Sequence, residues 1–237
     1  MSDNSNPSRW SLHDLLPEPD SKEMQDFLTQ LEGSVSFLEA ARSRLSPDIL
    51  VTEFLEALRY YEAIGKVASR LGAYAYLWFA EDTQNPAALN LRDRLDQILT
   101  EADNRTLFFS LWVKDLPEES AQRLISTSGD LRYYLESLRR FKPFTLSEAE
   151  EKIINLKDVN GLDALVNLYE MITNKFTFTL EVEGEEKSLT RDQLSSYYHH
   201  PSPGVREATF RELYRVYGEN AVLLAQIYFH RARDWHA

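Results

Sequence analysis

LVTEFLEALRYYEAIGKVASRLGAYAYLWFA, residues 50–80, is the stretch that decides the fold class of this chain. Its apolar residues recur every three or four positions, which is the period of an amphipathic helix. They are Leu50, Phe54, Leu58, Tyr61, Ile64, Ala68, Leu71, Ala75 and Trp78. Ser46-Pro47 has the composition of an N-cap followed by a first helical residue. The pattern therefore predicts one helix from Pro47 to about Ala80, roughly 50 Å long at 1.5 Å per residue.

Long helices are also predicted on both sides of this stretch. Asp20, with Glu23 three residues later, has the spacing of a capping box and predicts the start of the preceding helix. Asn85-Pro86 repeats the cap-and-proline signal, and the helix after it runs towards Trp112. Three long helices joined by short turns are expected to pack as an antiparallel bundle over residues 20–115. Residues 1–19 are expected to form a flexible start and a strap, anchored by Trp10, Leu12, Leu15 and Leu16.

Shorter elements are predicted after Leu116-Pro117, and residues 116–237 form the third predicted region. Its expected helices cover 118–126, 130–140, 145–156 (opened by a capping box over Thr145–Glu148), 162–173, 190–198 (capped by Thr190 and Gln193) and, as one long final helix, 203–237. Apolar and polar residues alternate over 176–182, which is typical of a half-buried strand. A turn at 183–185 and a short return strand complete a β-hairpin at about 176–189. The predicted class is mainly α, with one small hairpin that must lie on helices or join other strands.

The composition excludes several classes of function. The chain has 237 residues, no cysteine, a net charge of −12 and a pI near 4.9. Thiolate zinc sites, iron–sulfur clusters and cysteine nucleophiles are therefore excluded. The acidic charge balance argues against binding to nucleic acid or to an anionic membrane surface. Residues 1–8 are too polar for a signal peptide, and no 18-residue apolar run exists, so we expect a cytoplasmic protein.

The five histidines do not form a recognisable metal motif. A zinc-binding helix needs two histidines four residues apart, and no pair among His13, His199, His200, His230 and His236 has that spacing. The adjacent pair His199-His200 either belongs to a loop that binds a substrate backbone or ends a helix, and helix termination is the favoured interpretation. We therefore predict no catalytic, cofactor-binding or metal-binding residue in this chain.

The end of the predicted final helix lacks the residues that terminate helices. No Gly or Pro follows Arg231 up to Ala237, and the large apolar Trp235 lies in the last turn. We interpret the chain as the truncated front part of a longer protein. Apolar surface left uncovered along Leu213 to Ile227 is then expected to support self-association.

Several phrases resemble the N-terminal part of the oligoendopeptidase F branch of the M3 zinc metallopeptidases. Four stretches carry the resemblance. They are the opening Trp10-Ser11-Leu12-x-Asp14-Leu15, the segment Leu71–Tyr76 with Asp82–Pro86, the run Lys142–Lys152 after Tyr133-Tyr134-Leu135, and Val205–Ala208 leading to Tyr214 and Tyr217. Together they cover nearly the whole chain. Their order and spacing make the resemblance stronger than any one motif does.

The resemblance implies a cytosolic enzyme that hydrolyses short peptides within a deep channel. In that family a His-Glu-x-x-His helix and a downstream Glu hold the zinc, and neither is found in this sequence. The implied partners are a C-terminal catalytic domain and an oligopeptide substrate, with this part forming channel wall and being inactive alone. Two other hypotheses stay open: a stand-alone α-helical interaction module without catalytic activity, and an independent hydrolase that uses two facing carboxylates.

Overall fold

The computed structural model describes residues 11–236 of the chain, and it is mainly α-helical with one small β-hairpin, as predicted. The chain divides into two compact units, Met1–Val159 and Asn160–Ala237. The sequence placed a boundary after residue 115. The observed division lies later because α5 and α6, which follow that point, both pack on the third long helix.

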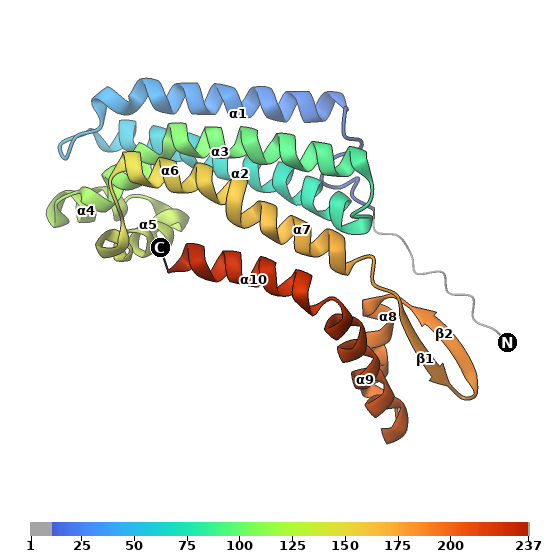
Figure 1. Cartoon of the computed structure of the whole chain (residues 1–237). Coiled ribbons are helices and arrows are strands. Elements are labelled where there is room, and N and C mark those ends of the chain that lie inside the picture. The colour runs from blue at the N-terminus through green and yellow to red at the C-terminus, as the bar shows by residue number, and fades with distance from the viewer. Residues whose placement is uncertain (1–10, 237) are drawn as a thin grey trace. The chain divides into compact units, whose positions relative to one another are not determined.

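The first unit is built on three long helices that lie side by side (Figure 1). Its helices are α1 (Lys22–Ala41), α2 (Val51–Glu81), α3 (Pro86–Asp115), α4 (Glu118–Ile125), α5 (Arg132–Arg140) and α6 (Glu148–Asp158). Short 3₁₀ turns stand at Arg42–Arg44, Gly129–Leu131 and Lys142–Phe144. Because α1, α2 and α3 all contact one another, the predicted antiparallel bundle of long helices is confirmed.

The core of this unit lies between the long helices. Phe54 of α2 and Phe109 of α3 are fully buried, and their ring centroids are 6.5 Å apart. Leu16, in the segment before α1, is buried, and Leu12 and Leu15 pack against the same core. The other expected anchor of the strap, Trp10, and the rest of residues 1–10 lie outside the described residues.

Helix starts show where the sequence signals were right. Asn85 accepts hydrogen bonds at its Oδ1 from the backbone N–H groups of Ala87 (3.0 Å) and Ala88 (3.3 Å), so the N-cap predicted for α3 is confirmed. The capping box formed by Thr190 and Gln193 is also present.

Three other predicted helix starts were wrong. Ser21 rather than Asp20 caps α1, because its hydroxyl accepts from the N–H of Met24. Ser147, paired with Glu150, replaces the predicted Thr145 box at the start of α6. α2 begins only at Val51, because Pro47 lies in a turn closed by the N–H of Ile49 and the carbonyl of Ser46 (3.2 Å).

The second unit surrounds the hairpin. Its elements are α7 (Ala164–Thr173), β1 (Phe178–Val182), β2 (Glu185–Leu189), α8 (Arg191–Ser196), α9 (Pro203–Glu219) and α10 (Ala221–Trp235), with a π-helical turn at Val159–Asp163 where the two units meet in the chain. β1 and β2 pair antiparallel with Phe178 opposite Leu189. The backbone at Glu183 and Gly184 has positive φ, 55° and 83°, as a two-residue type I′ turn requires.

The hairpin rests on helices of its own unit, which is one of the two alternatives that the sequence left open. Phe178, Leu180 and Val182 point to one side and are buried against Leu194 of α8 and Val216 of α9. The backbone N–H of Thr179 also donates to the Glu212 carboxylate of α9 over 2.7 Å. β1 is therefore held by apolar packing on one face and by a charged acceptor on its backbone.

The predicted single helix over 203–237 is broken at Asn220. Its side-chain Nδ2 donates to the carbonyl of Val216 (2.9 Å), and its backbone leaves helical geometry. Asparagine side chains compete with the backbone for hydrogen bonds and so favour helix ends over helix interiors. The chain consequently forms α9 and α10 as separate helices; Ala237 lies outside the described residues.

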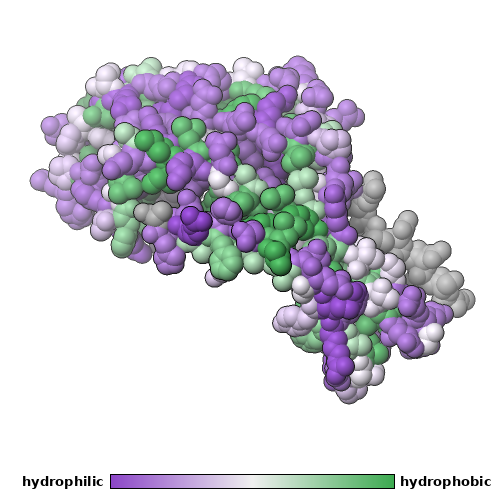
Figure 2. Space-filling model, in the orientation of Figure 1, coloured by the Kyte–Doolittle hydropathy of each residue, from purple (hydrophilic) through white to green (hydrophobic). Residues whose placement is uncertain are grey.

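The expected apolar strip also falls on other residues. Ile227 is buried, and Leu213, Tyr217 and Leu224 are half-buried. The exposed apolar side chains of α10 are Val222, Leu223, Tyr228, Phe229 and Trp235. Figure 2 shows apolar surface gathered where α7 and α10 lie in Figure 1. No described helix has the length and apolarity needed to span a bilayer.

Candidate functional site

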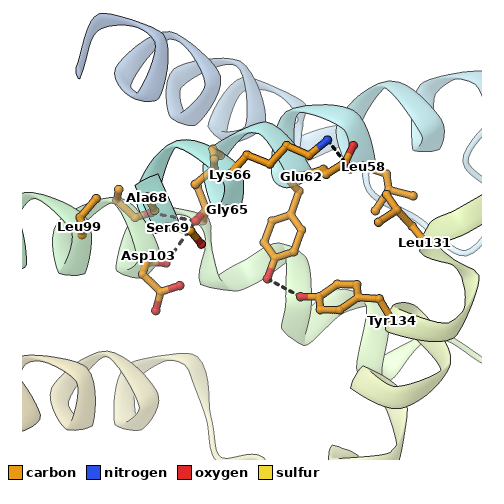
Figure 3. Close-up of a pocket in the computed structure, with 14 residues that line it drawn as sticks. Leu58, Glu62, Gly65, Lys66, Ala68, Ser69, Leu99, Asp103, Leu131 and Tyr134 are labelled. Carbon is orange, nitrogen blue, oxygen red and sulfur yellow. Dashed lines mark hydrogen bonds and ion pairs between the residues drawn. The ribbon is translucent and has the colours of Figure 1, made fainter. Parts of the chain in front are cut away.

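A groove of about 530 Å³ runs between α2 and α3 of the first unit (Figure 3). Its apolar walls come from Leu58, Ile64 and Ala68 of α2, Leu99 and Ala102 of α3, and Leu131 just before α5. These residues belong to the apolar faces of the helices that also build the bundle core. The groove therefore lies where the apolar faces of α2 and α3 meet. We call it the α2–α3 groove.

Two tyrosine hydroxyls meet at one end of the α2–α3 groove. The hydroxyl of Tyr134, on α5, donates to that of Tyr61, on α2, over 3.3 Å. The Tyr61 ring also packs on Phe109, with centroids 4.9 Å apart. Burial, with a smaller effect from Tyr134, raises the pKa of the Tyr61 phenol, so Tyr61 remains a neutral hydrogen-bonding group at physiological pH.

Asp103 of α3 places a carboxylate at the other end of the α2–α3 groove. The side chain is solvent-accessible, but protein surrounds it closely enough that desolvation raises the pKa of the carboxyl. One hydrogen bond opposes this effect: Asn155 Nδ2 of α6 donates to Asp103 Oδ2 over 3.1 Å. The protein around Asp103 therefore stabilises the charged form of this carboxylate only weakly.

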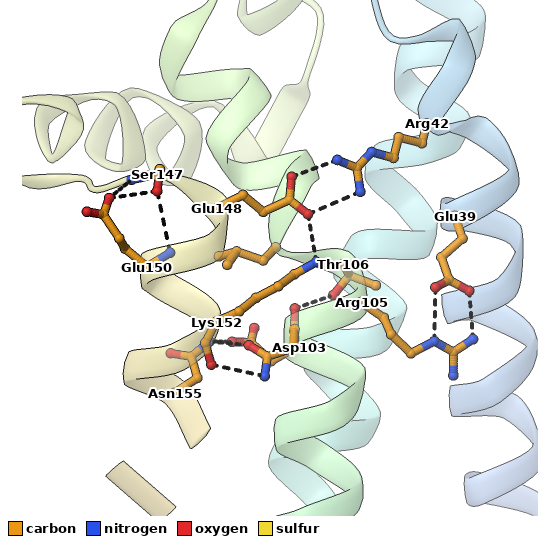
Figure 4. Close-up of polar contacts among 12 residues, drawn as sticks. Glu39, Arg42, Asp103, Arg105, Thr106, Ser147, Glu148, Glu150, Lys152 and Asn155 are labelled. Atoms are coloured by element: carbon orange, nitrogen blue, oxygen red, sulfur yellow. Dashed lines mark hydrogen bonds and ion pairs between the residues drawn. The ribbon is translucent and has the colours of Figure 1, made fainter. Parts of the chain in front are cut away.

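Asn155 also ties α6 to the groove wall (Figure 4). The same Nδ2 donates to Asn104 Oδ1 over 2.8 Å, so one amide bridges two neighbouring residues of α3. Asn104 Nδ2 lies 3.5 Å from the carbonyl of Lys152 in return. No residue of α6 is buried, so polar contacts carry much of its attachment to α3.

A second polar cluster fixes the beginning of α6. Arg42 binds the Glu148 carboxylate through two hydrogen bonds of 3.1 and 2.6 Å, and Lys152 Nζ lies 2.7 Å from Glu148 Oε1. Lys152, and less strongly Arg42, lower the pKa of Glu148. Both cations are thereby engaged by one carboxylate, and neither forms an ion pair with Asp103.

No histidine within residues 11–236 is among the residues that line the groove. His199 ends the short helical turn after α8, and His200 follows it and accepts at Nδ1 from the N–H of Ser202 over 3.2 Å. Arg206 holds this loop by donating to the carbonyl oxygens of His200 (2.7 Å) and Pro201 (2.9 Å). The helix-end interpretation of His199-His200 therefore matches the local structure, and Arg206 explains why the Val205–Ala208 phrase carries an arginine.

The described residues do not fit a catalytic zinc ion. Such a site needs three protein ligands with an open fourth position. Between residues 11 and 236, no three His, Asp or Glu side chains are grouped so that they could hold a metal ion. We derive no catalytic step through zinc from this chain.

The groove shows what sequence reasoning missed. From the sequence, Tyr61 is named only as part of a helix stripe and Tyr134 only as part of a family phrase, and Asp103 is not singled out. One signal was available: Asp103 follows Leu99 by four residues, so it continues the apolar stripe of α3 with a charge. Its meeting with Asn155 depends on a contact between residues 52 positions apart, which no local pattern reveals.

Comparisons with known proteins agree with the resemblance noted from the motifs. A family model described as Oligopeptidase F matches residues 112–178. The Oligopeptidase PepF of Bacillus subtilis (strain 168) is 24% identical over 219 residues, which cover 89% of this chain and 32% of that protein. This chain thus spans about a third of the length of that relative.

A solved structure shows the same fold. The oligoendopeptidase-F from Enterococcus faecium superposes with a TM-score of 0.73 at 20% identity, covering 90% of this chain and 41% of the other. This chain is therefore similar in sequence to the Oligopeptidase F family model and to the Bacillus relative, and similar in fold to the Enterococcus structure.

Proposed function

We propose that this chain is the N-terminal, non-catalytic region of an oligoendopeptidase F-like zinc metallopeptidase that hydrolyses short peptides. One observation carries the proposal: the similarity extends over 89% of this chain but only 32% of the Bacillus relative. The zinc-binding helix that the family requires has no counterpart in this sequence. The chemistry then belongs to a C-terminal catalytic domain that partners this region.

The proposed role of this region is to form part of the substrate-channel wall. The long-helix bundle supports that role, because helices of 31 and 30 residues packed together give a wall that resists bending. A wall of this kind restricts access by size, which suits an enzyme that acts on short peptides. Alone, the region is inactive. We also propose that the protein works in the cytoplasm.

The exposed side chains of α10 support the presence of a partner. Val222 is 82% exposed and Trp235 is 87% exposed, and large apolar side chains gathered on a surface mark an interaction site. The proposed occupant is the catalytic domain. In its absence, self-association through the same surface is expected, and the mass in dilute solution would measure it.

A chimera tests the proposal. The N-terminal region of the Bacillus Oligopeptidase PepF is replaced by this chain, and zinc-dependent hydrolysis of a fluorogenic oligopeptide is measured. We expect the chimera to be active and a chelator to abolish the activity. A folded, zinc-loaded chimera that cleaves no peptide, while the unmodified relative does, would contradict the assignment.

A further inference from the structure

The α2–α3 groove carries a negative charge that this chain does not neutralise. Asp103 receives one side-chain hydrogen bond, from the uncharged Asn155, and no Lys, Arg or His within residues 11–236 forms an ion pair with it. Glu62, the other acidic residue of the groove, is paired with Lys66 over 2.7 Å. One carboxylate is therefore left without a cationic partner in a concave, partly apolar setting.

The shape of the groove suits a side chain that is apolar along its length and positively charged at its tip. The aliphatic walls of the groove can cover a methylene chain, as apolar surfaces cover the stems of lysine side chains in proteins. The volume of about 530 Å³ lies within the range of small-ligand sites, roughly 300–1,000 Å³. The hydroxyls of Tyr61 and Tyr134 add hydrogen-bonding groups at the far end.

We propose that the α2–α3 groove binds a lysine side chain carried on a peptide, with the methylene chain along Leu99 and Ala68 and the ammonium group on Asp103. An ammonium ion donates up to three hydrogen bonds, and Asp103 keeps one carboxylate oxygen free of protein donors. The net charge of −12 also favours the approach of a cationic peptide. The inference does not rest on the proposed function, because all of the groove residues belong to this chain.

The desolvation of Asp103 is consistent with a bound ammonium group at this carboxylate. The surrounding protein raises the pKa of Asp103, which means that its charged form lacks stabilising neighbours. A bound ammonium group would supply the missing stabilisation. The same ammonium would gain little from Glu62, which Lys66 already neutralises.

Binding of two matched peptides to the 237-residue chain tests the proposal. The probes are acetyl-Leu-Lys-Leu-amide and acetyl-Leu-norleucine-Leu-amide, which differ only in the ammonium group, and titration calorimetry measures the dissociation constants. We expect the lysine peptide to bind about tenfold more tightly, the value expected for one charge-assisted hydrogen bond. Asp103→Asn should remove this preference, because Asn keeps an acceptor for Asn155 but loses the charge.

Glu101→Gln is the matched control. Glu101 lies two residues earlier on α3, is exposed and loses the same charge, so its variant should keep the tenfold preference. Amide chemical shifts of the unmodified chain provide a second measurement that needs no variant: the lysine peptide should perturb Ala68, Leu99 and Asp103 first. Equal binding of both peptides, a preference that survives Asp103→Asn, shifts confined to other residues, or no binding at millimolar peptide would each overturn the proposal.

Discussion

Single arginines hold the first unit together at points where helices end. Arg139 of α5 donates from Nη1 to the carbonyls of Val113 (2.8 Å) and Leu116 (2.9 Å), the last turn of α3 and the residue after it. Its Nη2 donates to Glu118 over 3.0 Å. A cation at the C-terminus of a helix satisfies carbonyls that have no partner within the helix, and it also interacts favourably with the helix dipole.

Arg139→Ala should lower the free energy of unfolding by about 2 kcal/mol, because a largely buried charge-assisted contact is lost and the carbonyls stay unsatisfied. Urea unfolding followed by circular dichroism measures the change. Arg132→Ala is the control: its ion pair with Glu136 on the same helix is exposed, so the expected loss is about 0.5 kcal/mol or less. Equal losses in both variants would show that Arg139 has no special role.

Arg105 predicts a pH dependence. Its guanidinium hydrogen-bonds to Glu32 and Glu39 of α1, and it lowers the pKa of both carboxyls below the value of about 4.3 expected in the unfolded chain. Carboxyls with a lowered pKa contribute stability above that unfolded value, and the contribution disappears as pH falls through the folded pKa.

The Arg105→Met variant should therefore be less stable than the unmodified chain at pH 7, by about 0.5–1 kcal/mol because the groups are partly exposed and screened. The difference should shrink as pH falls below about 4.3. Thermal unfolding of both proteins from pH 3 to 7 measures it. A difference that stays constant over this range would assign the effect to packing instead of charge.

Among the structural elements, the hairpin offers the sharpest test, because its turn needs positive φ at both central residues. Gly184 (φ 83°) suits that geometry, whereas Glu183 (φ 55°) does not, since residues with a β-carbon rarely adopt it. Glu183→Asn should stabilise the second unit by roughly 0.5 kcal/mol, because Asn-Gly is the favoured pair for a type I′ turn. Gly184→Ala should destabilise it by roughly 1–2 kcal/mol.

Hydrogen exchange of the β1 amides gives the readout for both variants. Slower exchange in Glu183→Asn and faster exchange in Gly184→Ala are expected. Changes of the same sign in the two variants would mean that the turn geometry does not limit the stability of the hairpin.

Helix caps could be predicted from short stretches of sequence, because a cap forms by hydrogen bonds between residues two or three positions apart. Asn85 and Thr190 were predicted as caps because no competing cap residue precedes the helix at a better position. Near Asp20 and Thr145 a serine lies one or two residues further on, and the structure uses the serine. The break at Asn220 was missed because the apolar spacing continues across it, and spacing carries no information about a side chain that bonds to its own backbone.

For the whole molecule, the class of fold followed from the helix period, but the division into units did not. α6 joins the first unit through Asn155 and Glu148, whose partners on α3 and beside α1 lie far away in the sequence. The α2–α3 groove depends on the same tertiary contacts. The sequence could therefore predict the helices that form the groove walls and place Asp103 on the stripe of α3, but not the contact between Asp103 and Asn155.

We have proposed that this chain is a non-catalytic region of a peptidase and that a different domain binds the catalytic zinc. Hydrolysis of a fluorogenic oligopeptide by the purified 237-residue chain, with zinc added and with or without a chelator, tests it most directly. We expect no hydrolysis above the buffer rate in either condition, while the chimera with the Bacillus catalytic domain is active. Hydrolysis by the chain alone that a chelator abolishes would contradict it.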